Sequence, residues 1–313
     1  MNSQGTERQT KNERRAQARE QARVARQAQQ QREKRNRLLM QGGVVVAVLA
    51  LLAIAAIVIT NTLRPAGPAV FPANMASGGV VFSKDLKVAE TAKLEEGADF
   101  QPTAYDASKK PQHVRVFVDF MCPACNNFEQ TYGNMLEQYT GAGDIELEIQ
   151  PVNFLDPQSA GTKYSTRAAN LFACVVEQQP DQAYSLFKKL FEVQPAEGTT
   201  GLTTQELLDH AYAAGVAQTE ELKSCAANLP FAPFLDRVTK QVLQTEILGI
   251  EKGTALVAVP QTGELQDPEK PQTLVSTPTV LVNGEQWYQP RDGDLEQFIL
   301  KKLQGTSTSN SSN

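Results

Sequence analysis

Two cysteines separated by two residues are the side chains in this sequence best suited to covalent chemistry. Cys122 and Cys125 form a Cys-Pro-Ala-Cys motif. Such a pair can exchange thiols for disulfides, but the same spacing also occurs in half of a zinc site and in small structural disulfide loops. A zinc site needs about four ligands, whereas Cys174 and Cys225 are isolated from each other and from the motif. The pattern therefore favours redox chemistry, and we expect no metal and no cofactor.

The elements on either side of the motif explain why its first cysteine would be reactive. Residues 113–120, rich in Val and Phe, fit a buried strand, and the residues after the motif have the apolar spacing of a helix. Cys122 then lies at the helix N-terminus, where unpaired backbone NH groups and the helix dipole stabilise a thiolate. Pro123 suits the first helical turn, and with Ala124 it should support the site. We expect Cys122 to exchange with substrate and Cys125 to be its shielded partner.

The chain after this helix predicts a strand and then a block of helices. Residues 145–150 alternate apolar and polar, which predicts a strand with one solvent-facing side. From about residue 162 to 248 the apolar spacing is helical, and Thr203 with Glu206 has the spacing of a capping box. His210 lies in this block and His113 begins a strand, so both are expected to be structural.

A hairpin and a final helix complete the predicted domain. Asn283-Gly284 separates two strand-like runs, which is a strong hairpin signal, and Asp294 can cap a last helix. Strand, helix, strand, helical block, hairpin and helix together predict one α/β domain over residues 80–304. The helical insertion occupies about residues 160–249 of that domain. Residues 305–313 are polar and of low complexity, which predicts a disordered tail.

The N-terminal part of the chain has the composition of a membrane anchor. Residues 1–37 carry eleven Lys or Arg and four Glu, and Gly42 to Ile59 is an unbroken run of eighteen apolar or Gly residues. This length favours a transmembrane helix over residues 38–63 rather than a cleaved signal peptide, whose apolar core is about 7 to 15 residues. Residues 64–79 are dominated by Pro, Ala and Gly and predict a flexible linker.

The charge of the flanks predicts how such an anchor would be oriented. Basic flanks are cytoplasmic, so the arm of residues 1–37 should lie in the cytoplasm and the domain after residue 64 outside the cell membrane, in a single-pass arrangement. We interpret the basic arm as a topology signal that also contacts anionic lipid rather than nucleic acid. An even number of cysteines fits an oxidising compartment, although four cysteines allow three different pairings.

Three features of the sequence resemble the DsbA-like branch of the thioredoxin superfamily, particularly its membrane-tethered actinobacterial members. They are DFMCPAC at residues 119–125, the helical insertion after it, and Ser276-Thr277-Pro278-Thr279 followed by VLVNG. The resemblance implies a thioredoxin-like fold with a helical insertion domain. It also implies that Pro278 is a cis-proline and that Thr277 contacts the active-site sulfurs, the alternative being an ordinary turn proline.

The same resemblance implies a structural disulfide between Cys174 and Cys225, with two free buried thiols as the alternative. The sequence also departs from its relatives. Met121 stands where thioredoxin has a tryptophan, which argues against a general reductase, and Val116 replaces a Glu that some relatives use in proton transfer. Asp119 is a candidate substitute for that proton relay, although a structural role is the stronger interpretation.

These observations favour a disulfide-forming oxidase that acts on reduced, unfolded secreted or cell-envelope proteins. The resemblance implies re-oxidation by a membrane partner of the DsbB or VKOR type, and we expect a monomer. An isomerase or reductase with the same site is the nearest alternative, although isomerases of this superfamily usually carry a separate dimerisation domain. A metal-handling or binding module is a third hypothesis. Residues 250–276 form a polar stretch beside the predicted active face whose conformation the sequence leaves open.

Overall fold

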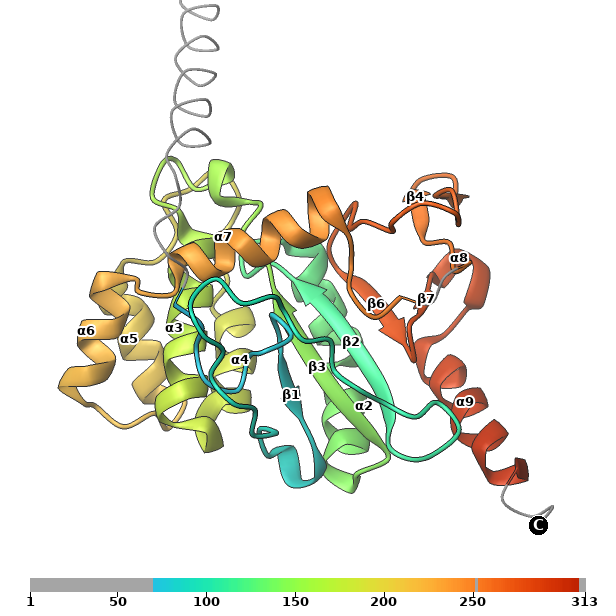
Figure 1. Cartoon of the computed structure of the whole chain (residues 1–313). Coiled ribbons are helices and arrows are strands. Elements are labelled where there is room, and N and C mark those ends of the chain that lie inside the picture. Colours follow the sequence, from blue (N-terminus) through green and yellow to red (C-terminus); the bar gives the residue numbers. More distant parts are fainter. Residues whose placement is uncertain (1–69, 251–252, 310–313) are drawn as a thin grey trace, which may run out of the picture. The chain divides into compact units, whose positions relative to one another are not determined.

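The structure, a computed structural model, describes residues 70–250 and 253–309 (Figure 1). The predicted basic arm (1–37) and transmembrane helix (38–63) lie outside these residues. Within the part of the chain that is described, no helix is long and apolar enough to span a bilayer. The predicted membrane anchor therefore stays a prediction.

A five-stranded mixed sheet forms the centre of the domain, with the strand order β1-β3-β2-β6-β7. β2 runs parallel to β3 and antiparallel to β6, and β1 and β7 add antiparallel edges. Because β2 is the middle strand, the residue at its C-terminal end emerges at the centre of the sheet. The predicted α/β class is confirmed. The strands are β1 (Val80–Phe82), β2 (Gln112–Val118), β3 (Ile145–Pro151), β6 (Thr279–Val282) and β7 (Glu285–Trp287).

In Figure 1 the insertion helices α3 to α6 gather at one side of the sheet, α7 runs along the top of the view, and α9 lies at the other side. The predicted capping box at Thr203 and Glu206 is confirmed at the start of α5. α7 ends at Lys240 and continues as a π-helical turn over Gln241–Thr245. The helices are α2 (Pro123–Ala142), α3 (Tyr164–Gln178), α4 (Ala183–Glu192), α5 (Thr204–Ala213), α6 (Glu220–Asn228), α7 (Ala232–Lys240), α8 (Gln289–Asp292) and α9 (Leu295–Ser309).

One hydrophobic core joins the sheet to the insertion. Val114, Val116 and Val118 of β2 are completely buried in the same cluster as the apolar residues of α2, α3 and α4. Phe120 continues this cluster beyond the strand and packs its ring against aromatic residues of α3 and α4, namely Phe172, Phe187 and Phe191. The insertion is therefore packed directly beneath the residues that precede the cysteine motif.

The segment predicted as a flexible linker (64–79) differs from that prediction in its described part. Phe71 and Met75 are buried in the core, and the ring of Phe71 packs edge-on against Phe100 and Phe234, each at 5.4 Å. A few large apolar side chains outweigh the Pro, Ala and Gly around them, because each can gain about 1.5–3 kcal/mol from burial. The folded domain therefore begins near residue 71.

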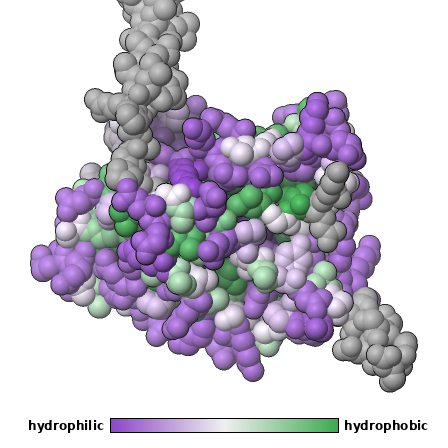
Figure 2. Space-filling model, in the orientation of Figure 1, coloured by the Kyte–Doolittle hydropathy of each residue, from purple (hydrophilic) through white to green (hydrophobic). Residues whose placement is uncertain are grey.

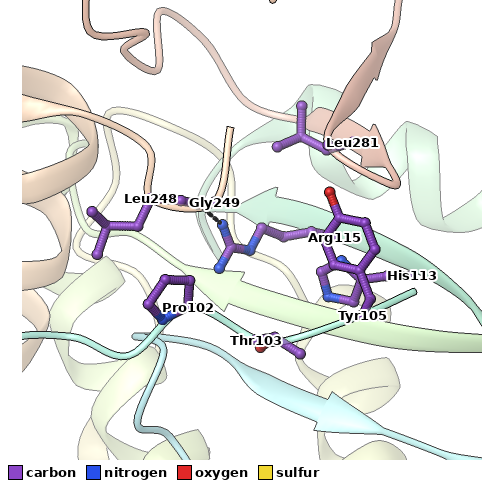
Figure 3. Close-up of a pocket in the computed structure, with 9 residues that line it drawn as sticks. Pro102, Thr103, Tyr105, His113, Arg115, Leu248, Gly249 and Leu281 are labelled. Carbon is purple, nitrogen blue, oxygen red and sulfur yellow. Dashed lines mark hydrogen bonds between the residues drawn. The ribbon is translucent and has the colours of Figure 1, made fainter. Parts of the chain in front are cut away.

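The opposite face of the sheet carries a buried ion network, although an exposed face was predicted for β3. Glu148 is fully buried, and Arg115 Nε and His113 Nε2 each lie 2.9 Å from its carboxylate. Burial alone would raise the pKa of Glu148, but Arg115 and His113 hold this pKa well below its usual range. Figure 3 shows the small pocket beside this network, where Arg115 also donates to the Leu248 carbonyl at 2.9 Å and Tyr105 stacks on His113.

The hairpin and the C-terminus complete the domain. Asn283 and Gly284 both have positive φ, as the tight turn between β6 and β7 requires, so the predicted hairpin is confirmed. α9 extends to Ser309, so the backbone of residues 305–309 is helical where a disordered tail was predicted. Extending an existing helix adds one hydrogen bond per residue without a new nucleation step. Residues 310–313 lie outside the described residues.

Candidate active site

The turn between β2 and α2 presents the cysteine motif. β2 ends at Val118 and α2 begins at Pro123, so Cys122 is the residue that caps the helix. The Cys122 carbonyl oxygen accepts from the backbone NH groups of Cys125 at 3.0 Å and Asn126 at 3.2 Å, which closes the first turn. Pro123 lies at the start of the helix, where its missing NH leaves no bond unmade. Strand, motif and helix follow the predicted order.

Two side chains hold this turn in place, one from the turn itself and one from the insertion. Asp119 is fully buried, and its carboxylate accepts hydrogen bonds from the NH of Met121 at 2.9 Å and from the Ser165 hydroxyl at 2.6 Å. Gln194, which follows α4, donates from Nε2 to the carbonyl oxygens of Phe120 at 3.1 Å and Cys122 at 3.0 Å. Sequence reasoning missed Gln194, because no local pattern shows that a glutamine 72 residues away reaches the motif.

The structural role of Asp119 is the one that its contacts support. Its carboxylate also accepts from the NH of Leu155 at 3.0 Å, so it ties the turn to the segment after β3. Burial raises the pKa of Asp119 to about 7, against the hydrogen bonds from Ser165, Met121 and Leu155 that favour the carboxylate. Asp119 is thus a positioning residue, and its use as a proton relay stays a prediction.

The two cysteines of the motif are both reduced but have different environments. Cys122 is 7% exposed, whereas Cys125 is completely buried. Hydrogen bonding from the Cys125 thiol, helped by Thr277 and by the NH groups of Cys125 and Ala124, lowers the pKa of Cys122 from 9.0 to about 6, against the opposing effect of burial. Burial and the neighbouring Cys122 raise the pKa of Cys125 well above its usual range. Near neutral pH, Cys122 is a thiolate and Cys125 a thiol donor.

The loop before β6 faces this pair. The Thr277–Pro278 peptide bond is cis, and in the thiol form of Cys122 its Sγ donates a hydrogen bond to the carbonyl oxygen of Thr277 at 3.4 Å. The Thr277 hydroxyl is buried and has no hydrogen-bond partner among the described residues. Thr277 is nevertheless one of the groups that lower the pKa of Cys122. The structure thus brings together Cys122, Cys125 and Thr277, which are 155 residues apart at most.

The remaining cysteines form a disulfide remote from this chemistry. Cys174 in α3 and Cys225 in α6 are bonded, with their Cα atoms 6.1 Å apart. The bond fastens two helices of the insertion to each other, so these cysteines do not join the exchange site. Across the described residues, no group of three His, Cys, Asp or Glu side chains is arranged to hold a metal ion.

A family model described as thioredoxin matches residues 103–301, which contain the motif, the insertion and the loop with Pro278. The chain belongs to the thioredoxin family. The resemblance inferred from the sequence is thereby confirmed.

Several known proteins are similar to parts of the chain. A serine/threonine-protein kinase of Mycobacterium tuberculosis, PknE, is 30% identical over 107 residues, which are 33% of this chain and 19% of the kinase. The chain thus matches only about a fifth of the length of such curated relatives. Among solved structures, that of the disulfide bond oxidoreductase DsbG of M. tuberculosis is similar to this chain at 20% identity. The match covers 75% of this chain and 95% of that chain, with a TM-score of 0.47. BdbD of Bacillus subtilis is 20% identical, and the match covers 76% of this chain and 98% of that chain with a TM-score of 0.47. The thiol-disulfide oxidoreductase MdbA of Corynebacterium diphtheriae is 13% identical, and the match covers 75% of this chain and 94% of that chain with a TM-score of 0.46.

Proposed function

We propose that this chain is an extracytoplasmic protein disulfide oxidoreductase that introduces disulfides into reduced secreted or cell-envelope proteins. The observation that carries the proposal is the asymmetry of the motif. Cys122 is the less deeply buried of the two and has a thiol pKa lowered to about 6, whereas Cys125 is completely buried and its pKa is raised. A cysteine with a stabilised thiolate is a good leaving group, which makes its disulfide oxidising.

The reaction starts from the oxidised protein, in which Cys122 and Cys125 are bonded. A substrate thiolate attacks Cys122 Sγ, the bond between Cys122 and Cys125 breaks, and Cys125 leaves as a thiolate that is then protonated. A second substrate thiolate attacks the substrate sulfur of the mixed disulfide and displaces the Cys122 thiolate. The substrate gains a disulfide and the protein is left with two reduced cysteines. Thr277 and the helix N-terminus stabilise the thiolate that leaves in this second step.

Continued turnover needs an oxidant that returns the pair to the disulfide. We propose a membrane partner of the DsbB or VKOR type and a single-pass anchor over residues 38–63 that keeps the domain at the outer surface of the cell membrane. The charge-free apolar run and the basic arm before it support this location. The disulfide between Cys174 and Cys225 is also typical of an oxidising compartment.

The direct test is oxidation of a reduced, unfolded protein with several cysteines by the full chain in mild detergent. Stoichiometric oxidation that is lost in Cys122→Ser would support the oxidase. Slow oxidation together with efficient reshuffling of scrambled disulfides would instead favour an isomerase. Failure of the oxidised wild-type protein to react with any thiol would refute the proposal.

A further inference from the structure

Gln194 is the residue through which the helical insertion reaches the backbone of the cysteine motif. Hydrophilic side chains cover most of the face shown in Figure 2, so residue type alone does not single out a glutamine, whereas its contacts do. Gln194 Nε2 donates to the carbonyl oxygens of Phe120 at 3.1 Å and Cys122 at 3.0 Å. One side-chain amide therefore joins the reactive cysteine to the residue that leads into its turn.

The end of α4 presents this amide together with an aromatic ring. Phe191 lies in the last turn of α4, and its carbonyl oxygen accepts from the NH of Gln194 at 3.3 Å. The ring of Phe191 packs against the ring of Phe120, with the ring centroids 5.3 Å apart. The insertion therefore holds Phe120 at two points, by its side chain and by its carbonyl oxygen.

The loop that follows Gln194 is fastened at its far end. The guanidinium of Arg167 in α3 donates to the carbonyl oxygens of Thr200 at 3.2 Å and Leu202 at 2.5 Å. Arg167 Nε also donates to the Thr162 carbonyl at 2.9 Å, which ties this loop to the segment before α3. Gln194 thus projects from backbone that is held on both sides, and little conformational entropy remains to be lost when its amide holds the turn.

The other side of the turn contacts the loop before β6, where Cys122 Sγ lies 3.4 Å from the carbonyl oxygen of Thr277. The groups that lower the pKa of Cys122 are uncharged, and they are the Cys125 thiol, Thr277 and the backbone NH groups of Cys125 and Ala124. Each acts through a hydrogen bond, which weakens steeply as its geometry departs from the preferred distance and angle. The stability of the Cys122 thiolate therefore depends on how firmly the turn is held.

We propose that Gln194 is a positioning residue for thiol-disulfide exchange, which keeps Cys122 between the helix N-terminus and the loop before β6 by bridging the carbonyl oxygens of Phe120 and Cys122. The inference rests on the proposed function and adds a residue to that same site. Gln194 bonds backbone oxygens rather than the sulfur, so it acts through the groups that stabilise the thiolate.

The step that this positioning serves is the release of Cys122 from the mixed disulfide. A second substrate thiolate attacks the substrate sulfur, the bond between that sulfur and Cys122 Sγ breaks, and Cys122 leaves with the electron pair as a thiolate. A turn that is already held offers the leaving sulfur its hydrogen-bond donors without further rearrangement.

The test replaces Gln194 by methionine in the full chain, because methionine has a similar length but no hydrogen-bond donor. In the reduced protein, the pKa of Cys122 should rise from about 6 by about half a unit to one unit, as expected when a hydrogen bond to a charged group is weakened. The measurement is the pH profile of iodoacetamide alkylation at Cys122, located by mass spectrometry. At pH 7 the equilibrium with glutathione should move about three- to fivefold toward the protein disulfide, because the reduced form loses thiolate stability.

Gln179→Met is the matched control, since it also removes two side-chain hydrogen bonds to backbone within the insertion. Gln179 Nε2 donates to the Ala217 carbonyl at 3.0 Å, and Gln179 Oε1 accepts from the Ala217 NH at 2.7 Å. Ala217 lies between α5 and α6, so this variant should keep the wild-type alkylation profile and glutathione equilibrium. Gln194→Glu is a second test variant, because its carboxylate has no donor at pH 7, and it should raise the pKa of Cys122 at least as much as methionine does.

Wild-type alkylation and glutathione equilibrium in both Gln194 variants would overturn the positioning role and leave the proposed function standing. Equal shifts in Gln194→Met and Gln179→Met would also overturn it, because they would trace the effect to the stability of the insertion as a whole. Failure of the oxidised wild-type protein to react with glutathione or any other thiol would refute the proposed function, and the positioning role with it.

Discussion

The choice of substitution at Cys125 can remove or keep the hydrogen bond that contributes most to the low pKa of Cys122. Cys125→Ala removes the donor, whereas Cys125→Ser keeps a hydroxyl in its place. The pKa of Cys122 lies about three units below its ordinary value of 9.0, and hydrogen bonds to charged groups contribute roughly 1.5–3 kcal/mol, or about one to two pKa units. The alanine variant should therefore have a pKa of about 7 to 8 at Cys122. The serine variant should stay near 6.

The assay is the pH dependence of iodoacetamide alkylation at Cys122, measured by mass spectrometry. Because Cys174 and Cys225 are bonded to each other, Cys122 is the one free cysteine left in either variant. At pH 7 the thiolate fraction should fall from roughly nine-tenths in the serine variant to between about one-tenth and one-half in the alanine variant. Identical pH profiles for the two variants would refute the role assigned to the Cys125 thiol.

Three further outcomes concern stability. The folded-state pKa of Asp119 is raised to about 7. The neutral carboxyl therefore contributes fully to the unfolding free energy below about pH 4, and this contribution is lost as the pH rises through 7. In the oxidised protein, Asp119→Asn should flatten the fall in unfolding free energy over that window, by up to about 4 kcal/mol, and an unchanged slope in urea melts would contradict this. Replacing both Cys174 and Cys225 by Ser should lower the unfolding free energy by roughly 2–4 kcal/mol while leaving Cys122 alkylation unchanged; slower alkylation would show that the bridge shapes the site. Glu148→Gln should lower the unfolding free energy by roughly 3–5 kcal/mol, because Arg115 would lose its buried counter-charge. A loss below about 1 kcal/mol would count against the ion network.

The part of the site that was foreseen is the part encoded by neighbours in sequence. A strand that runs into Cys-Pro-Ala-Cys and a helix places Cys122 at the helix N-terminus through local geometry alone. The capping box at Thr203 and the turn at Asn283 are likewise set by a few adjacent residues. Pro278 and the bridge between Cys174 and Cys225 were implied by the resemblance, since spacing alone gave no means of choosing them.

What the sequence left open depends on contacts between distant segments. Glu148 looked like a solvent-facing residue, because the strand pattern does not show that Ser77, His113 and Arg115 close over it. Phe71 was placed in a linker by the composition around it, although its partners come from elsewhere in the chain. The contact of Gln194 with the active-site turn has the same origin.

The central claim is that Cys122 is the exchanging sulfur and Cys125 its shielded partner. The most direct measurement is to incubate Cys122→Ser and Cys125→Ser variants of the full chain with a peptide activated as a mixed disulfide and to locate the adduct by mass spectrometry. We predict rapid capture of the peptide on Cys122 in the Cys125→Ser variant and little capture on Cys125 in the other. Equal capture by both variants, or faster capture on Cys125, would contradict the account.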